Sequence, residues 1–249
     1  MAKKIQRIEN IQLGTASSLT RYGDKEDSLL ITLPETAKVS CQFTNNKLKA
    51  APVKLAIEHL SHSSNGEKAF LINAGNANAA TGSQGMRDVR FYCKEMASDL
   101  NLKKENIIPF STGVIGEAFP LDNYLNAFRE AKSKLSVKNW SKAANAILTT
   151  DTKPKIISKQ VKIEKEIYSI TGFAKGSGMI RPDFATLLSF VFVDAKVNQR
   201  SLNKIHADAL DVSFNAITVD GDTSPNDSSV LVVNGNENKS IKPLSLIHI

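Results

Sequence analysis

The sequence predicts an α/β or α+β fold built on a mixed β-sheet, because strand-like and helix-like segments both occur without strict alternation. The chain has 249 residues, 41% of them hydrophobic, which is enough to bury a sizeable core. One strand candidate, residues 186–193 (TLLSFVFV), is apolar on both faces. That pattern is typical of a central strand that is covered on both sides.

Apolar residues spaced three or four positions apart predict three helices. These helices cover residues 89–100, 121–135 and 202–212. Runs rich in β-branched and aromatic residues predict further strands. These strands cover residues 69–73, 107–110, 160–163, 167–171 and 230–233. No internal repeat or low-complexity tract interrupts the order.

Composition excludes several classes of protein. No stretch approaches 18 consecutive apolar residues, so no transmembrane helix is expected. The N-terminus, MAKKIQRIEN, is basic but has no apolar segment of the kind found in secretory signals. The two cysteines, Cys41 and Cys93, share no metal-ligand spacing. Two thiols in a chain of this length fit a reducing cytoplasm, which is the expected location.

The net charge of +7 raises the question of an anionic partner. The lysines are spread along the chain, and the densest stretches, 132–142 and 153–165, are interrupted by apolar and acidic residues. Solvated faces of helices and strands are therefore favoured over a nucleic-acid groove, and no nucleic-acid-binding motif has the required spacing. The same positive field would help to attract a small anionic substrate.

Two segments at predicted strand ends are rich in small and hydroxyl residues. Residues 73–82 (NAGNANAATG) predict a tight packed loop with exposed amides that lines a site, because Asn and Gly tolerate left-handed backbone. Residues 111–116 (STGVIG) follow the strand IIPF. Here the Thr112 hydroxyl and the Gly113 amide could point at one oxygen, as an oxyanion hole requires. Taken alone, this second segment is better explained as a plain strand–turn.

The third segment, residues 175–186, runs from Lys175 through glycines into Thr186 at the head of the apolar strand. A phosphate loop is excluded, because neither glycine-rich phosphate motif occurs here. A threonine hydroxyl is a weak nucleophile by itself. Freed as an N-terminus, Thr186 would carry an α-amine, of pKa about 7.7–8.0, that can serve as its base. The alternative is a threonine selected only for its preference for strands.

The fourth segment, residues 219–227 (VDGDTSPND), clusters Asp and Asn side chains. Its spacing departs from that of a calcium-binding EF-hand, so a loop shaped by Asx turns is favoured over a metal site. His59 and His62 form H-x-x-H without a third ligand. They are therefore interpreted as surface or core histidines, and no metal site is expected.

Taken together and in this order, these segments resemble the ornithine acetyltransferase family, the bifunctional glutamate N-acetyltransferases of arginine biosynthesis. The resemblance extends over most of the chain, from about residue 43 to residue 233. The combination is specific, although no single stretch is. The matching stretches are residues 43–53, 72–82, 111–117, 148–155, 174–188 and 219–227.

The resemblance implies a role for particular residues. The family cleaves itself at an Ala–Thr bond, which here is Ala185–Thr186, so residues 1–185 would form an α chain and residues 186–249 a β chain. Thr186 would be the nucleophile, and Thr112 and Gly113 would form the oxyanion hole. Thr149 and Lys175 would help to hold the substrate. The implied fold is the layered N-terminal-nucleophile-like fold of the ornithine acetyltransferase and aminopeptidase type, and the implied assembly is an α2β2 heterotetramer.

The implied reaction is a double displacement in which Thr186 takes the acetyl group of N2-acetylornithine and then passes it to glutamate. No metal or prosthetic group is implied, because an ester stores the acetyl group. Some members also accept acetyl-CoA as donor, and no motif reveals whether this chain does. The partners implied are small molecules and further copies of the chain, with no nucleic acid and no membrane.

This chain departs from the family pattern at both ends. Residues 13–24 match the family's early glycine- and alanine-rich segment poorly. The family also continues beyond the equivalent of residue 233, so we expect a truncated β chain in which residues 234–249 are a non-native tail. A related aminopeptidase or amidase, with water in place of glutamate, is the alternative enzyme. A non-catalytic ligand- or nucleic-acid-binding module is the alternative outside enzymes.

Overall fold

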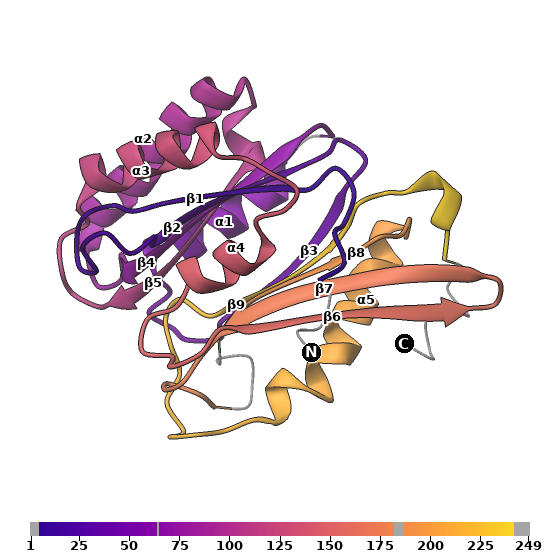
Figure 1. Cartoon of the computed structure of the whole chain (residues 1–249). Coiled ribbons are helices and arrows are strands. Elements are labelled where there is room, and N and C mark those ends of the chain that lie inside the picture. The colour runs from indigo at the N-terminus through magenta and orange to yellow at the C-terminus, as the bar shows by residue number, and fades with distance from the viewer. Residues whose placement is uncertain (1–4, 64, 182–186, 242–249) are drawn as a thin grey trace.

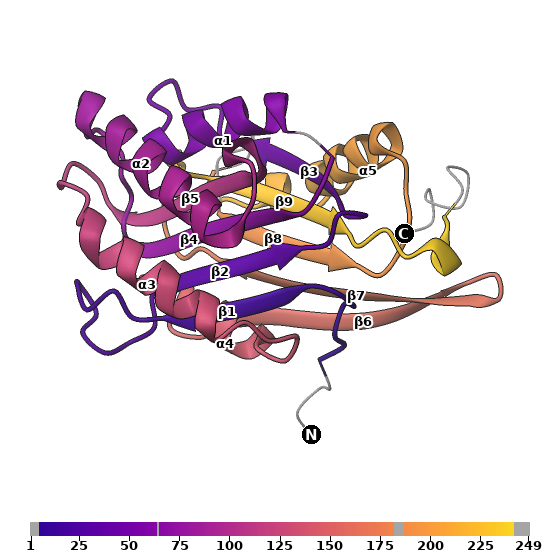
Figure 2. The same cartoon turned by 90° about the horizontal axis from the view of Figure 1, so that it is seen from above.

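The computed structural model describes residues 5–63, 65–181 and 187–241. In it, two β-sheets pack face to face, with helices on their outer faces and one helix, residues 140–146, at the edge between them (Figures 1 and 2). The helices are α1 (Ala51–His62), α2 (Gly82–Leu100), α3 (Leu121–Ser133), α4 (Trp140–Ala146) and α5 (Gln199–Asp211). Three short 3-10 helices are η1 (Lys104–Asn106), η2 (Phe214–Ala216) and η3 (Glu237–Lys239).

The first sheet has the strand order β1-β2-β4-β5. Its strands are β1 (Gln12–Ala16), β2 (Ser28–Leu33), β4 (Lys68–Asn76) and β5 (Ile107–Val114). The second sheet has the order β3-β9-β8-β7-β6. Its strands are β3 (Lys38–Phe43), β6 (Lys155–Ile163), β7 (Glu166–Lys175), β8 (Leu188–Val193) and β9 (Ser228–Val233). The pairs β4–β5 and β8–β9 are parallel and the others antiparallel, so both sheets are mixed, as predicted.

Aromatic side chains fill the space between the two sheets. Phe110 of the first sheet packs edge-to-face on Phe190 of the second, with ring centroids 5.2 Å apart, and on Phe70 at 5.5 Å. The period-two alternation of strands explains this inner core, because Phe70 and Ile72 face the second sheet while Leu71 faces the helices. The inner core thus ties β5, which ends near Thr112, to β8.

The outer helices are amphipathic and bury one face each. Tyr92 and Met96 of α2 and Phe128 of α3 pack on the outer face of the first sheet. Helix α5 lies on the second sheet, on the side away from the first (Figure 1), and its Leu202 packs in one cluster with Tyr168 and Val233 of that sheet. The chain after β9 also packs here, since Ile241 is 7% exposed and joins the same cluster as Leu202.

The predicted helices 89–100, 121–135 and 202–212 correspond to α2, α3 and α5, and the predicted strands correspond to β4 to β9. The central position predicted for strand 186–193 is confirmed for Leu188–Val193, since β8 lies in the middle of its sheet. Several predicted boundaries are wrong. α2 begins at Gly82, β6 begins at Lys155, β7 ends at Lys175 and β8 begins at Leu188. β4 runs on to Asn76 and β5 to Val114, because the parallel pairing continues there. Three strands and two helices were not predicted: β1, β2, β3, α1 and α4.

Within the described ranges, no helix is long and apolar enough to cross a membrane.

Candidate active site

Thr112 and Gly113 lie side by side at the end of β5, where they pair with Ala74 and Gly75 of β4. The Thr112 residue is 5% exposed, so its position is held by packing. Gly113 has a φ of 136°, which L side chains rarely adopt. The predicted oxyanion pair therefore belongs to a strand end and not to a flexible turn.

Buried amides brace this strand end. Asn73 donates from Nδ2 to the Asn76 carbonyl at 2.7 Å and accepts at Oδ1 from the Ser111 hydroxyl at 2.5 Å. Asn76 in turn donates from Nδ2 to the Ala118 carbonyl at 3.0 Å. Most residues of 73–82, which were expected to expose their amides, are buried. The amide side chains of Asn73 and Asn76 bond to neighbouring backbone and to Ser111 instead of facing solvent. The expectation of a packed segment is confirmed, and that of exposed amides is wrong.

Thr149 and Lys175 are brought into contact although they are 26 residues apart. Lys175, the last residue of β7, donates from Nζ to Thr149 Oγ1 at 3.1 Å. The neighbouring Gly176 amide donates to Asp151 Oδ1 at 2.9 Å, and Lys155 forms an ion pair with the same carboxylate. The two residues assigned to substrate binding thus share one corner of the second sheet.

The 219–227 loop joins three of the motif segments. The Thr44 amide donates to the Asp227 carbonyl at 2.9 Å, and Asn226 donates from Nδ2 to the Ala77 carbonyl at 2.6 Å. Asp220 accepts from the amides of Met179 and Ile180 at 2.7 and 2.9 Å. Asp220 Oδ1 also accepts from the Asp222 amide at 3.3 Å, which is the Asx-type bond expected of this loop.

The strand that follows Thr186 lies between these groups. Leu188 pairs with Lys175 on one side and with Ser228 on the other, and the Leu187 carbonyl accepts from the Ser228 amide at 3.0 Å. Thr186 and Ala185, the predicted nucleophile and cleavage position, lie outside the described residues. Two residues after Thr186, the chain is therefore flanked by the β7 end that carries Lys175 and by the β9 start next to Asp227.

The charges at this corner perturb one another. Burial lowers the pKa of the Lys175 ammonium, and the carboxylates of Asp151 and Asp227 oppose that change. Burial raises the pKa of Asp227 to about 7, against the influence of Lys175. Burial alone would raise the pKa of Asp151, but the hydrogen bonds from Lys155 and Gly176 bring it below its ordinary value. Such opposed shifts in one place are typical of functional sites.

Sequence reasoning did not single out Asp151 or Asp227 as site residues. Asp151 lies in the stretch LTTDT, and Asp227 was assigned with its neighbours to loop structure. The available signal was a lone carboxylate in the hydroxyl-rich stretch LTTDT for Asp151, and one of three carboxylates in residues 219–227 for Asp227. That signal is weak, because only the fold shows that both carboxylates act on Lys175, which is far away in the sequence.

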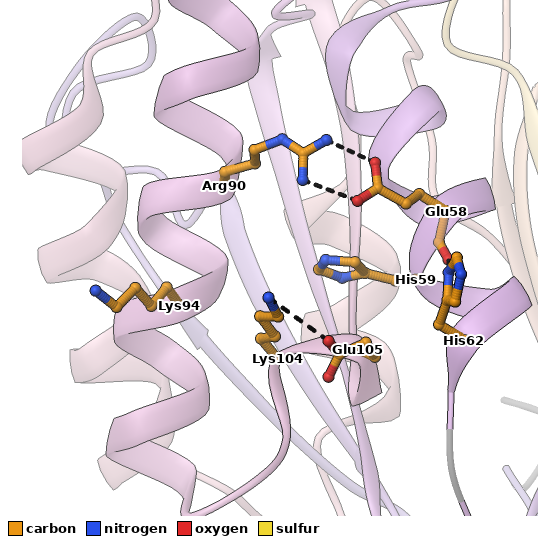
Figure 3. Close-up of a pocket in the computed structure, with 7 residues that line it drawn as sticks. All are labelled: Glu58, His59, His62, Arg90, Lys94, Lys104 and Glu105. Carbon is orange, nitrogen blue, oxygen red and sulfur yellow. Dashed lines mark hydrogen bonds and ion pairs between the residues drawn. The ribbon is translucent and has the colours of Figure 1, made fainter.

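A pocket of about 380 Å³ lies elsewhere, between α1, α2 and η1 (Figure 3). Its charges largely compensate one another, since Arg90 binds Glu58 through two hydrogen bonds and Lys104 lies 3.7 Å from Glu105. His59 is buried and its Nδ1 bonds to the Ile107 carbonyl at 2.7 Å, which confirms a core histidine. None of the residues predicted for catalysis or substrate binding lines this pocket.

The chain is similar to known proteins that are named for a role in arginine biosynthesis. It is 42% identical over 240 residues to the arginine biosynthesis bifunctional protein ArgJ of Colwellia psychrerythraea, covering 93% of this chain and 57% of that protein. It is 43% identical over 225 residues to ArgJ of Methylococcus capsulatus, covering 90% of this chain and 54% of that protein. The chain thus spans little more than half the length of these curated relatives.

Solved structures of an ArgJ protein and an ornithine acetyltransferase are also similar to this chain. The ArgJ crystal structure from Bacillus halodurans superposes with a TM-score of 0.61 at 31% identity, covering 71% of this chain and 91% of that one. Ornithine acetyltransferase from Mycobacterium tuberculosis, complexed with ornithine, superposes with a TM-score of 0.59 at 26% sequence identity. The superposition covers 71% of this chain and 93% of that one. The L-aminopeptidase D-Ala-esterase/amidase of Ochrobactrum anthropi, a variant of the Ntn hydrolase fold, superposes with a TM-score of 0.50 at 9% sequence identity. The superposition covers 91% of this chain and 71% of that one, and it shows a likeness of fold alone.

These neighbours confirm the predicted fold type. The model of the ArgJ family matches residues 12–246, nearly the whole sequence. The chain therefore belongs to the ArgJ family.

Proposed function

We propose that the complete protein transfers an acetyl group from N2-acetylornithine to glutamate, with Thr186 as the nucleophile. Family membership supports the reaction, and so does the likeness to an ornithine acetyltransferase that binds ornithine. The observation that carries the site assignment is the contact of Lys175 with Thr149 at the end of β7, next to the strand that begins two residues after Thr186.

In this proposal, maturation cuts the Ala185–Thr186 bond and frees the Thr186 α-amine. That amine accepts the proton of the Thr186 hydroxyl while Oγ attacks the acetyl carbonyl of acetylornithine. The Thr112 hydroxyl and the Gly113 amide donate to the developing oxyanion. Ornithine leaves with the proton, and the acetyl group stays on Oγ as an ester. The amine of glutamate then attacks this ester, which releases N-acetylglutamate and restores Thr186.

The remaining roles follow the family pattern. Lys175 and Thr149 hold a carboxylate of the substrate, since an ammonium and a hydroxyl are both suitable donors for one. Acetyl-CoA serves as a second donor if the protein is bifunctional, and the reaction uses no metal. The cleaved chains, residues 1–185 and the chain beginning at Thr186, assemble as α2β2 in the cytoplasm.

The test uses the complete protein, purified and examined by denaturing gel and mass spectrometry. We expect two chains, the second beginning Thr-Leu-Leu-Ser, and a gain of one acetyl group on Thr186 after incubation with acetylornithine alone. Adding glutamate should remove that group and yield N-acetylglutamate. Thr186→Ala should stay uncut and unacetylated, whereas Thr152→Ala, which changes an exposed threonine, should behave as the unmutated protein.

The competing enzyme is an aminopeptidase or amidase in which water accepts the acyl group. It shares the fold with this chain, as the Ochrobactrum anthropi structure does. Release of acetate at an equal rate with and without glutamate would favour it. An uncut chain that never carries an acetyl group would contradict both enzymes.

A further inference from the structure

Two carboxylates favour the charged form of Lys175, one from Asp151, which precedes it in the sequence, and one from Asp227, which follows it. Asp151 follows Thr149 by two residues, and its side chain is 0% exposed. Asp227 directly precedes β9 and is 8% exposed. Each keeps one buried oxygen, Oδ2, that accepts no hydrogen bond from any part of the chain that the structure describes. Both therefore have acceptor capacity left for a cation at this corner of the sheet.

Strand register explains why these groups meet. Lys175 of β7, Leu188 of β8 and Ser228 of β9 lie in one row across three neighbouring strands. Asp227 is the residue before Ser228, so it lies one position along the chain from that row. Asp151 arrives from the loop before β6, where its Oδ1 accepts from the Gly176 amide, next to Lys175. Hydrogen-bonded backbone thus sets the positions of both carboxylates.

A partly buried ammonium in such a place needs negative charge nearby to stay protonated. Burial disfavours the charged form of an amine and lowers its pKa. The charged groups acting on Lys175 are Asp151 and Asp227, which raise its pKa, and Lys155, which lowers it. Lys155 is itself paired with Asp151, which reduces the effect of its positive charge on Lys175.

We propose that Asp151 and Asp227 keep Lys175 positively charged and directed at Thr149, and so act as positioning residues for the binding of a substrate carboxylate. This inference rests on the proposed function, in which Lys175 holds the carboxylate that acetylornithine and glutamate both carry. Without the two acids, Lys175 would be a neutral amine over more of the working pH range. A neutral amine binds a carboxylate far more weakly than an ammonium does.

The main test is Asp227→Asn in the complete protein, because the amide keeps the shape of the side chain and removes only its charge. Removing an opposite charge that acts on an ammonium lowers its pKa, by about one unit at the lower end of the usual range. The alkaline limb of the pH profile of kcat/KM for acetylornithine should therefore move down by about one pH unit. At pH values above the limb of both proteins, the KM for acetylornithine should rise by up to about 10-fold, with kcat little changed. Asp227→Glu should restore part of the loss.

Asp222→Asn is the matched control, since it removes an exposed charge from the same loop. It should leave both the limb and the KM unchanged. Asp151→Asn tests the second carboxylate and covers the case in which Asp227→Asn does not fold. Asp151→Asn should also move the alkaline limb of the kcat/KM profile to lower pH.

A second measurement needs no activity. Brief labelling with isotopically marked acetic anhydride over a range of pH, read by mass spectrometry, reports the midpoint at which Lys175 becomes reactive. We expect a lower midpoint in Asp227→Asn and Asp151→Asn than in Asp222→Asn. Unchanged midpoints and an unchanged alkaline limb would overturn the inference while acetyl transfer stands. Shifted midpoints in a protein that transfers no acetyl group would overturn the proposed function and leave the charge effect standing.

Discussion

Gly113 and Gly75 approach each other so closely that a Cβ on Gly113 would lie 2.2 Å from the carbonyl carbon of Gly75. It would also lie 2.5 Å from the Asn76 amide nitrogen. Both contacts involve backbone, which cannot swing aside as a side chain does. Together with the φ of 136°, they show that only glycine fits this position between β4 and β5. The local geometry of the candidate oxyanion pair therefore depends on a residue without a side chain.

The first prediction is that Gly113→Ala lowers the free energy of unfolding by about 1–3 kcal/mol more than backbone strain alone would, because the new methyl group also overpacks the strand pair. Urea denaturation followed by circular dichroism measures the change. Gly116→Ala is the control. Gly116 also has a positive φ, of 86°, but a Cβ there meets nothing within 4 Å, so only the backbone strain of about 1–2 kcal/mol applies. Equal losses in the two variants would show that the contact with Gly75 is unimportant.

The second prediction concerns the hydroxyl of Thr112. Thr112→Val keeps the branched shape of a residue that is 5% exposed, so the fold should survive. Loss of one oxyanion donor typically costs about 10²–10³-fold in kcat. We expect a fall of that size in acetyl transfer, with a smaller change in KM. Full activity in the cleaved Thr112→Val protein would mean that this hydroxyl does not face the reacting oxygen.

Sequence patterns predicted the elements whose apolar residues are large and regularly spaced. In α2, Val89, Tyr92 and Met96 mark one face, and all three are buried. In α1 the buried face instead includes Ala56 and His59, so its periodicity is weak in the sequence. The strand β1 (QLGTA) has one large apolar residue, and α4 has only seven residues. Tertiary packing, rather than local pattern, determines these segments.

The site was predictable only as far as its motifs are local. Thr112 and Gly113 are neighbours in the sequence, and their strand-end position follows from the run IIPF before them. The contact of Lys175 with Thr149 spans 26 residues. The electrostatic interaction of Asp227 with Lys175 joins two residues that are 52 positions apart in the sequence. Such contacts depend on the order of strands in the second sheet. No periodicity within one segment contains that order.

The third prediction tests the aromatic core between the sheets. Phe190 of β8 contacts Phe70, Phe110 and Phe173 with ring centroids 6.3, 5.2 and 5.5 Å away. Phe190→Ala should lower the free energy of unfolding by about 3–5 kcal/mol, because it removes a fully buried ring and leaves a cavity. Phe91→Ala removes a ring that is 47% exposed and should cost far less. Similar shifts in urea midpoint would contradict this account of the core.

The fourth prediction concerns His206, which α5 buries against the outer face of the second sheet. His206 is 4% exposed. Its Nε2 lies 3.0 Å from the Ser229 hydroxyl and its Nδ1 3.0 Å from the Ser40 hydroxyl. Ser229 already accepts from Ser189 at 2.7 Å, so its own proton is free to be donated to Nε2. The neutral ring with its proton on Nδ1 satisfies all of these groups.

Protonation would disrupt this network, because both ring nitrogens would then be donors and Ser229 would lose its acceptor. Burial accordingly lowers the pKa of His206 from 6.5 to about 4. The unfolded chain therefore binds more protons than the folded protein between pH 6.5 and about 4. The contribution of His206 to stability is complete above pH 6.5, and about 3 kcal/mol of it is lost as the pH falls to about 4.

Urea denaturation of the unmutated protein and of His206→Gln, measured from pH 7.5 down to pH 4, checks this dependence. The comparison must be a difference, because the raised pKa of Asp227 acts in the opposite direction and the lowered pKa of His59 in the same one. His206→Gln should lose stability at pH 7.5, where the neutral ring and its hydrogen bonds are missing. It should then approach the unmutated protein as the pH falls, because only the latter has a histidine to protonate. A constant gap between His206→Gln and the unmutated protein across this range would mean that His206 does not titrate with folding.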